Sequence, residues 1–111
     1  GTQQPVDLVV AEYLRRRDML VAGLNAIPGV ICRTPQGAFY AFPNITAFGR
    51  SSEWLADYLL EKAGVAVLPG SSFGANGEGY LRICFANSFE KIQQAVGRIG
   101  EALSKLPLKT R

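Results

Sequence analysis

Apolar residues recur along this chain with two different periods, and each period predicts one kind of element. Spacings of three and four residues, typical of an amphipathic helix, extend over three segments. These segments stop at residues that end helices, the first at Pro28, the second at Gly64 and the third at Pro107. We therefore predict helices at residues 6–27, 52–63 and 88–106.

Four short runs rich in β-branched and aromatic residues predict strands, at 30–34, 38–42, 65–68 and 80–86. The first two runs are separated by Pro35-Gln36-Gly37, which is typical of a hairpin turn. The element order α-β-β-α-β-β-α predicts an α+β fold of two layers, in which three helices cover a small sheet of about four strands. The 111 residues are enough for a single domain, 1–111, whose polar tail is at 106–111.

Side-chain chemistry adds two details to the predicted helices. Arg17 falls within the apolar stripe of the first helix, where we expect it to cover the edge of the core or to form an ion pair, a ligand-binding role being the alternative. That stripe consists of Val10, Tyr13, Leu14, Val21 and Leu24. The third helix is expected to begin at Asn87 or Ser88, with Glu90 three residues after Asn87 as in a capping box.

One charged residue, Arg82, lies inside the last predicted strand. Strand alternation divides the run into two faces, with Leu81, Ile83 and Phe85 on one and Tyr80, Arg82, Cys84 and Ala86 on the other. Because its neighbours in sequence are uncharged, Arg82 needs an anionic partner or a pocket open to solvent. The pattern leaves two interpretations open: an internal ion pair, or a binding site for the carboxylate of a ligand.

The glycine-rich loop at residues 70–79 precedes this strand. It lacks the Lys-Ser/Thr pair of a phosphate-binding loop, and the next element is a strand rather than a helix. We therefore interpret the loop as a flexible connection between two strands rather than a phosphate site.

Composition excludes several classes of function. The excess of 12 Lys+Arg over 9 Asp+Glu is small and local, so nucleic-acid binding is not expected, and no run approaches the roughly 20 apolar residues of a membrane span. Cys32 and Cys84 are expected to be buried free thiols in a reducing cytoplasm. With no histidine and with lysines that look solvated, the chain has no metal site and no complete catalytic apparatus of its own.

Several motifs, in order and spacing, resemble the C-terminal small domain of class I pyridoxal-phosphate aminotransferases, especially the bacterial aspartate aminotransferase branch. They are the run at 13–18 with Arg16-Arg17-Asp18, then Gly29-Val30 with Pro35-Gln36-Gly37-Ala38-Phe39-Tyr40, and above all the runs at 64–70 and 77–86. The resemblance covers nearly the whole chain. It implies that Arg82 binds the α-carboxylate of an amino-acid substrate and that Phe39 lies beside it near the cofactor, whereas Arg16, Arg17 and Asp18 are assigned a structural role.

The resemblance also implies what this chain lacks. In that family the Schiff-base lysine and the groups that hold pyridoxal 5'-phosphate belong to a larger domain, and the family's chains are several times longer. We therefore expect the C-terminal piece of a longer enzyme, here called the parent enzyme. The parent would be homodimeric and would transfer an amino group between an amino acid, aspartate by resemblance, and 2-oxoglutarate, while this piece alone would bind no cofactor.

Two alternatives remain open on the sequence alone. Related cofactor enzymes include carbon–sulfur lyases with the same carboxylate-binding arginine. The chain could also be a complete module that binds a carboxylate ligand or a protein without catalysis.

Overall fold

The computed structural model describes residues 4–109 and has the α+β fold that the sequence predicts. Its helices are α1 (Gln4–Asn25), α2 (Ser52–Ala63) and α3 (Phe89–Ser104), and its strands are β1 (Tyr40–Ala41), β2 (Leu68–Pro69) and β3 (Leu81–Cys84). Short 3-10 turns lie at η1 (Thr46–Phe48), η2 (Gly70–Phe73) and η3 (Ala75–Gly77). The strands pair antiparallel in the order β1-β3-β2, so β3 is the central strand.

The prediction of about four strands is wrong by one, because residues 30–34 form no regular strand. Their pairing is limited to an isolated bridge between Ile31 and Asn44. The side chain of Asn25, at the end of α1, accepts a hydrogen bond from the backbone N–H of Cys32 and donates one to its carbonyl, each 2.8 Å long. Because these backbone groups are used by a side chain, they are not available to a strand ladder.

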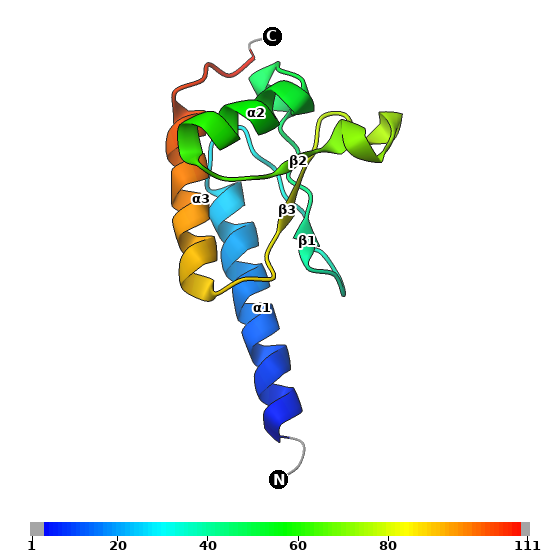
Figure 1. Cartoon of the computed structure of the whole chain (residues 1–111), viewed down its shortest axis with the longest axis vertical. Helices are drawn as coiled ribbons and strands as arrows, with labels where there is room; N and C mark the ends of the chain where they lie inside the picture. Colours follow the sequence, from blue (N-terminus) through cyan, green and yellow to red (C-terminus); the bar gives the residue numbers. More distant parts are fainter. Residues whose placement is uncertain (1–3, 110–111) are drawn as a thin grey trace.

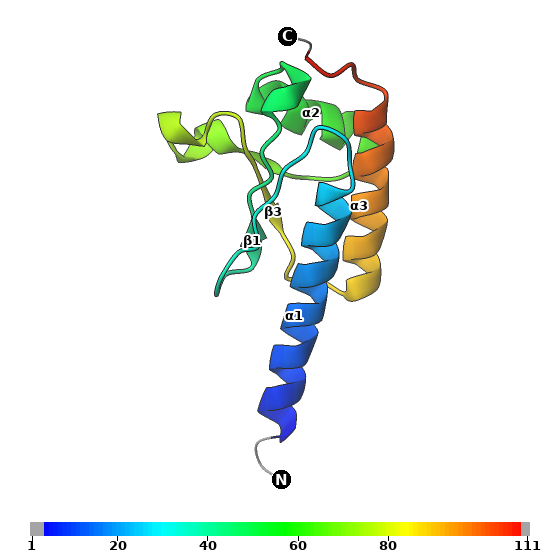
Figure 2. The ribbon, with the colours of Figure 1, turned by 180° about the vertical axis from the view of Figure 1, so that it is seen from behind.

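The helices and the sheet form two layers. In both views of the ribbon, α1 and α3 run side by side on one side of the sheet, and α2 crosses the end from which the C-terminal segment leaves (Figures 1 and 2). The first turns of α1 project beyond the other elements (Figure 1). This projection explains why only the second half of the predicted stripe is buried: Leu24 is 1% exposed, whereas Val10 is 49% exposed.

The core lies between the helices and the inner face of β3. Leu81, Ile83 and Phe85 point into it, as strand alternation predicts. The helices supply most of its other large buried side chains, Leu20 and Leu24 from α1, Leu55 and Leu59 from α2, and Ile92, Ile99 and Leu103 from α3. Ile45 and Phe48 add to it from the segment before α2. Burying this apolar surface supplies most of the stability of the domain.

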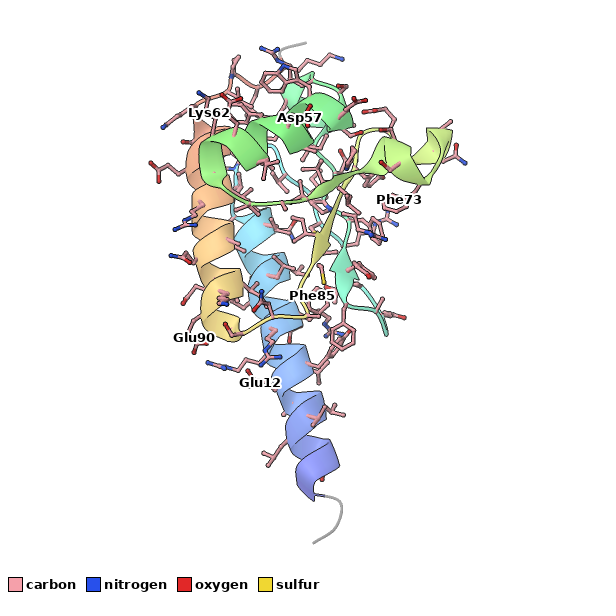
Figure 3. The ribbon with its side chains drawn as sticks, viewed as in Figure 1. Glu12, Asp57, Lys62, Phe73, Phe85 and Glu90 are labelled. Carbon is pink, nitrogen blue, oxygen red and sulfur yellow. The ribbon has the colours of Figure 1, made fainter. Side chains whose placement is uncertain are left out.

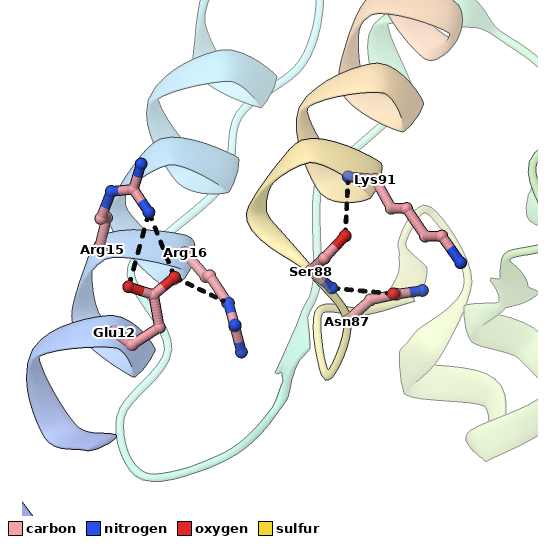
Figure 4. A network of polar contacts seen from close by, with 6 residues as sticks. All are labelled: Glu12, Arg15, Arg16, Asn87, Ser88 and Lys91. Atoms are coloured by element: carbon pink, nitrogen blue, oxygen red, sulfur yellow. Dashed lines mark hydrogen bonds and ion pairs between the residues drawn. The ribbon is translucent and has the colours of Figure 1, made fainter. Parts of the chain in front are cut away.

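Serine side chains cap the N-termini of α2 and α3. Ser51 accepts a hydrogen bond from the backbone N–H of Trp54, and Ser88 accepts one from Lys91 (Figure 4). The predicted capping box of Asn87 and Glu90 is therefore wrong, because the cap residue is Ser88 and the third residue after it is a lysine. Asn87 instead accepts a hydrogen bond from the N–H of Ser88.

The glycine-rich loop is folded back on itself rather than extended. A Cβ atom on Gly70 would lie 1.9 Å from the carbonyl oxygen of Gly77, and one on Gly77 would lie 2.0 Å from that of Gly70. The two backbone segments can cross at this distance only because neither residue has a side chain. Two of the loop's glycines therefore allow a close backbone crossing, and the description of the loop as a plain flexible connection is too simple.

Candidate functional site

Arg82 lies in the middle of β3, on the face of the sheet opposite the helices. In the antiparallel register Leu68 of β2 pairs with Arg82, and Tyr40 of β1 pairs with Cys84. The alternation along β3 places Arg82 on the outer face, where it is half-buried, and Cys84 beside it, where the thiol is exposed. The expectation that both cysteines are buried is thus wrong for Cys84 and confirmed for Cys32, because only one of them points into the core.

Two aromatic rings lie against the guanidinium of Arg82. Its Cζ atom is 4.3 Å from the centre of the Tyr40 ring and 4.4 Å from that of Phe73. Tyr40 belongs to β1 and Phe73 closes the turn that follows β2, so the rings come from the two segments that pair with β3 or follow its partner. Figure 3 labels Phe73. Both contacts have the geometry of a cation–π interaction.

Arg82 has no acidic partner within residues 4–109. The ion pairs in this part of the chain join Arg15 and Arg16 to Glu12, Arg17 to Asp18, and Lys62 to Glu61, all on helices (Figure 4 shows the first two). A guanidinium remains charged at any physiological pH and offers five N–H donors. Of the two interpretations of Arg82, the internal ion pair finds no support among the described residues, and its donors remain free for an anion.

Phe39 lies in an aromatic cluster next to α1, beyond the C-terminal end of β3. Its ring is 5.2 Å from that of Tyr13 in an edge-to-face arrangement and 5.9 Å from that of Phe85, whose position Figure 3 shows. The hydroxyl of Tyr13 donates to the carbonyl of Ala38 at 2.6 Å, which fixes the chain just before Phe39. Phe39 itself is 50% exposed, so part of the ring is open to solvent.

Phe39 therefore packs on the helix side of the sheet, whereas Arg82 lies on the outer face. The ring from this part of the chain that touches Arg82 is that of Tyr40. Tyr40 belongs to the aromatic run at 39–42, and this run is the sequence feature that could have indicated it. The run alone does not tell which of its rings faces a ligand. Phe73 stands among serines and glycines in a loop, and no spacing rule connects it to Arg82. Its placement depends on how the loop folds.

The outer face of the sheet is rich in exposed apolar side chains. They are Ile31, Tyr40, Phe42, Leu68, Phe73 and Tyr80, each at least 37% exposed. Ile31, Phe42 and Tyr80 also line a surface hollow of about 540 Å³ together with Arg33. An apolar face of this extent marks a surface that contacts a ligand or another protein segment.

Comparison with known sequences decides the family. The sequence model of the family "Aminotransferase class I and II" matches residues 2–99, which is most of the chain. This chain belongs to the class I and II aminotransferase family.

Individual aminotransferases show the same relationship. An aspartate aminotransferase of Pyrococcus horikoshii is 49% identical over 98 residues, which make up 88% of this chain and 25% of that protein. An aromatic-amino-acid aminotransferase of Thermococcus litoralis is 40% identical over 105 residues, 95% of this chain and 27% of that protein. The crystal structure of an aspartate aminotransferase from Rhizobium meliloti is 38% identical and matches with a TM-score of 0.86 over 96% of this chain and 29% of its own length. The chain thus spans about a quarter of the length of these aminotransferases.

Membership of the aminotransferase family implies pyridoxal 5'-phosphate as the cofactor of the full-length enzyme. The residues of this chain do not fit a site for it. Lys62, Lys91, Lys105 and Lys109 are all exposed, whereas a lysine that forms a Schiff base is held in a desolvated or electropositive setting that lowers its pKa. None of the four lysines of this chain therefore lies in the setting that a Schiff-base lysine needs.

Three further features bear on the setting of this domain. Arg17 lies 3.0 Å from Asp18, as an ion-paired structural arginine would. Burial raises the pKa of the Cys32 thiol, which keeps that thiol protonated. Between residues 4 and 109 no helix carries an apolar stretch long enough to cross a bilayer.

Proposed function

We propose that this chain is the C-terminal small domain of a longer pyridoxal-phosphate-dependent aminotransferase, in which Arg82 binds the α-carboxylate of the amino-acid substrate. The observation that carries the proposal is the half-buried guanidinium of Arg82, which lies on the central strand without an acidic partner among the described residues. A planar guanidinium donates two parallel hydrogen bonds to a carboxylate, which selects geometry as well as charge.

In this proposal the domain contributes substrate binding rather than bond breaking. Arg82 orients the substrate, Phe39 forms part of the wall beside it, and the exposed apolar face helps to exclude water when the domain closes on the rest of the enzyme. The Schiff-base lysine and the cofactor site would belong to residues outside this chain. The parent enzyme would act as a homodimer in the cytoplasm, which suits the two free cysteines.

The reaction that we propose for the parent enzyme is amino-group transfer between an amino acid and 2-oxoglutarate, with aspartate as the preferred amino donor. Relatives named as aspartate aminotransferases support this choice, whereas those named for aromatic amino acids keep a second substrate class in the comparison. The names of these relatives favour an aminotransferase over a carbon–sulfur lyase.

Replacing the arginine in the full-length enzyme tests the proposal. We expect Arg82→Leu to lower kcat/KM by about a hundredfold or more, roughly 3 kcal/mol, because a substrate carboxylate would be left unpaired in a closed site. The kcat/KM of Arg82→Lys should lie between those of the wild type and Arg82→Leu, because lysine keeps the charge but lacks the paired donors. The measurement is steady-state transamination with aspartate and with an aromatic amino acid.

Arg98→Leu is the matched control. It removes an equal charge from an exposed position on α3 and should leave kcat/KM within about twofold. A loss of less than tenfold in Arg82→Leu would overturn the assignment of Arg82 to the substrate carboxylate.

A further inference from the structure

The Arg82 guanidinium is held by aromatic rings that reach it from both sides of its strand. An arginine side chain is long and flexible, so an unpaired arginine on a sheet surface would sample many rotamers. Here Tyr40 comes from β1 and Phe73 from the turn after β2, and their rings lie 4.3 and 4.4 Å from the Arg82 Cζ atom. The two contacts restrict the guanidinium to one region of the outer face.

The N–H groups of Arg82 take part in none of the ion pairs of the described residues. A guanidinium that stacks on an aromatic ring uses its flat face, whereas hydrogen bonds to a carboxylate use its N–H groups, which lie in the plane. An acidic partner would compete with a substrate carboxylate for the same donors, but an aromatic ring does not. The rings can therefore hold Arg82 in place and still permit the ion pair with a substrate.

Two other arginines of the described chain contact aromatic rings, and each of them contacts a single ring. Arg15 lies 3.8 Å from the centre of the Phe89 ring, and Arg50 lies 4.2 Å from that of Trp54. Among these three arginines, Arg82 is the one that contacts two rings, whereas Arg15 also pairs with Glu12.

The fold of the glycine-rich loop places Phe73. The loop starts with a hydrogen bond of 2.7 Å from the N–H of Gly70 to the carbonyl of Tyr80, and Gly70 then crosses Gly77 in close contact. The crossing turns the chain into η2, at whose end Phe73 meets Arg82. The loop thus carries an aromatic residue to the arginine, a role that its sequence does not reveal.

We propose that Tyr40 and Phe73 are positioning residues that hold the guanidinium of Arg82 ready for the carboxylate of the substrate. This inference rests on the proposed function, in which Arg82 binds that carboxylate. Preorganisation of this kind removes the entropy cost of ordering Arg82 when the substrate binds. Its loss should therefore weaken substrate binding more than it slows the chemical step.

A double-mutant cycle in the full-length holoenzyme tests the inference. Tyr40→Leu and Phe73→Leu should each raise KM for the amino-acid substrate about three- to thirtyfold, with kcat changed less than about threefold. Tyr40→Phe and Phe73→Tyr keep the rings and should restore KM to within about twofold of the wild-type value. In an Arg82→Leu background neither leucine substitution should weaken kcat/KM further, because the rings act through the arginine.

Trp54→Leu serves as the control, since it removes the single-ring contact that Trp54 of α2 makes with Arg50 and should leave KM unchanged. If Arg82→Leu lowers kcat/KM more than tenfold but the ring variants keep the wild-type KM, or add their full effect to that of Arg82→Leu, the positioning role is wrong and the proposed function stands. If Arg82→Leu itself has little effect, the proposed function fails and the positioning role with it.

Discussion

At the scale of single residues, Glu78 is the carboxylate with the most hydrogen bonds in the described chain. It accepts bonds from the backbone N–H and the hydroxyl of Ser52, at 2.9 and 3.0 Å, and from the N–H of Gly79 at 2.8 Å. Ser52 is the fully buried first residue of α2, so Glu78 joins the end of the glycine-rich loop to the start of that helix. The N–H of Ser52 is the main cause that lowers the pKa of Glu78, and the other two donors act in the same direction.

This carboxylate should make the stability of the domain depend on pH. Its pKa is lower in the folded protein than in the unfolded chain, so its contribution is present above the unfolded value and is lost as the pH falls through the folded value. We expect the midpoint temperature of thermal unfolding of the wild type to decrease as the pH is lowered from about 5 to about 3. Glu78→Gln should lower the midpoint temperature at pH 7 and make it depend less on pH between about 5 and about 3. Thermal unfolding followed by circular dichroism measures both.

Glu61→Gln is the matched control for Glu78. Glu61 is exposed on α2 and has only a long contact of 3.8 Å with Lys62, so its substitution should change neither the midpoint nor the pH dependence. Equal pH profiles for Glu78→Gln and the wild type would show that the Glu78 hydrogen bonds do not stabilise the domain.

The alternation along β3 was predictable from the sequence, but the neighbours of Arg82 were not. Leu81, Ile83 and Phe85 are buried as a period of two requires, and Arg82 lies on the opposite face. Tyr40 and Phe73 are 42 and 9 residues away from Arg82 in the sequence, and only strand pairing and the loop crossing bring them to it. Local patterns therefore predict which face a residue occupies, whereas its partners depend on tertiary structure.

At the scale of elements, helices were better predicted than strands. The breakers Pro28 and Gly64 lie just after the observed ends of α1 and α2, because each acts on the backbone locally. The strands depend on pairing with distant residues. The run at 30–34 forms no strand because the side chain of Asn25 binds the backbone of Cys32, and the pattern of apolar residues does not predict this contact.

The cap of α3 provides a test at this scale. Ser88 accepts a hydrogen bond of 3.2 Å from the backbone N–H of Lys91, which would otherwise lack a partner inside the helix. We expect Ser88→Ala to destabilise the domain by about 1 kcal/mol. The free energy of unfolding can be measured by urea denaturation at neutral pH.

Ser72→Ala supplies the comparison for Ser88. Ser72 is an exposed serine of η2, and its loss should change the free energy of unfolding by less than about 0.5 kcal/mol. Equal stabilities of the two alanine variants would contradict the capping role of Ser88.

At the scale of the whole molecule, the helical side of the sheet is covered and the other side is open. The helices bury the inner face of β3, while the outer face exposes Tyr40, Phe42 and Phe73 beside Arg82. A chain that spans about a quarter of its aminotransferase relatives and carries such a face fits the proposed role as one wall of a substrate site. The opposite wall, with the groups that hold the cofactor, would then come from the rest of the parent enzyme.

If the cofactor site belongs to the rest of the parent enzyme, the 111-residue chain alone should bind pyridoxal 5'-phosphate only weakly and at no single lysine. All four lysines are exposed on the surface, whereas a lysine that forms a specific Schiff base is held in a desolvated setting. We expect a weak Schiff-base absorption band that rises without saturating at one equivalent and that falls only partly when any single lysine is replaced by arginine. A band that saturates at one equivalent and disappears in one Lys→Arg variant would mean that this domain holds the cofactor itself, and it would overturn the assignment of the catalytic lysine to the rest of the parent enzyme.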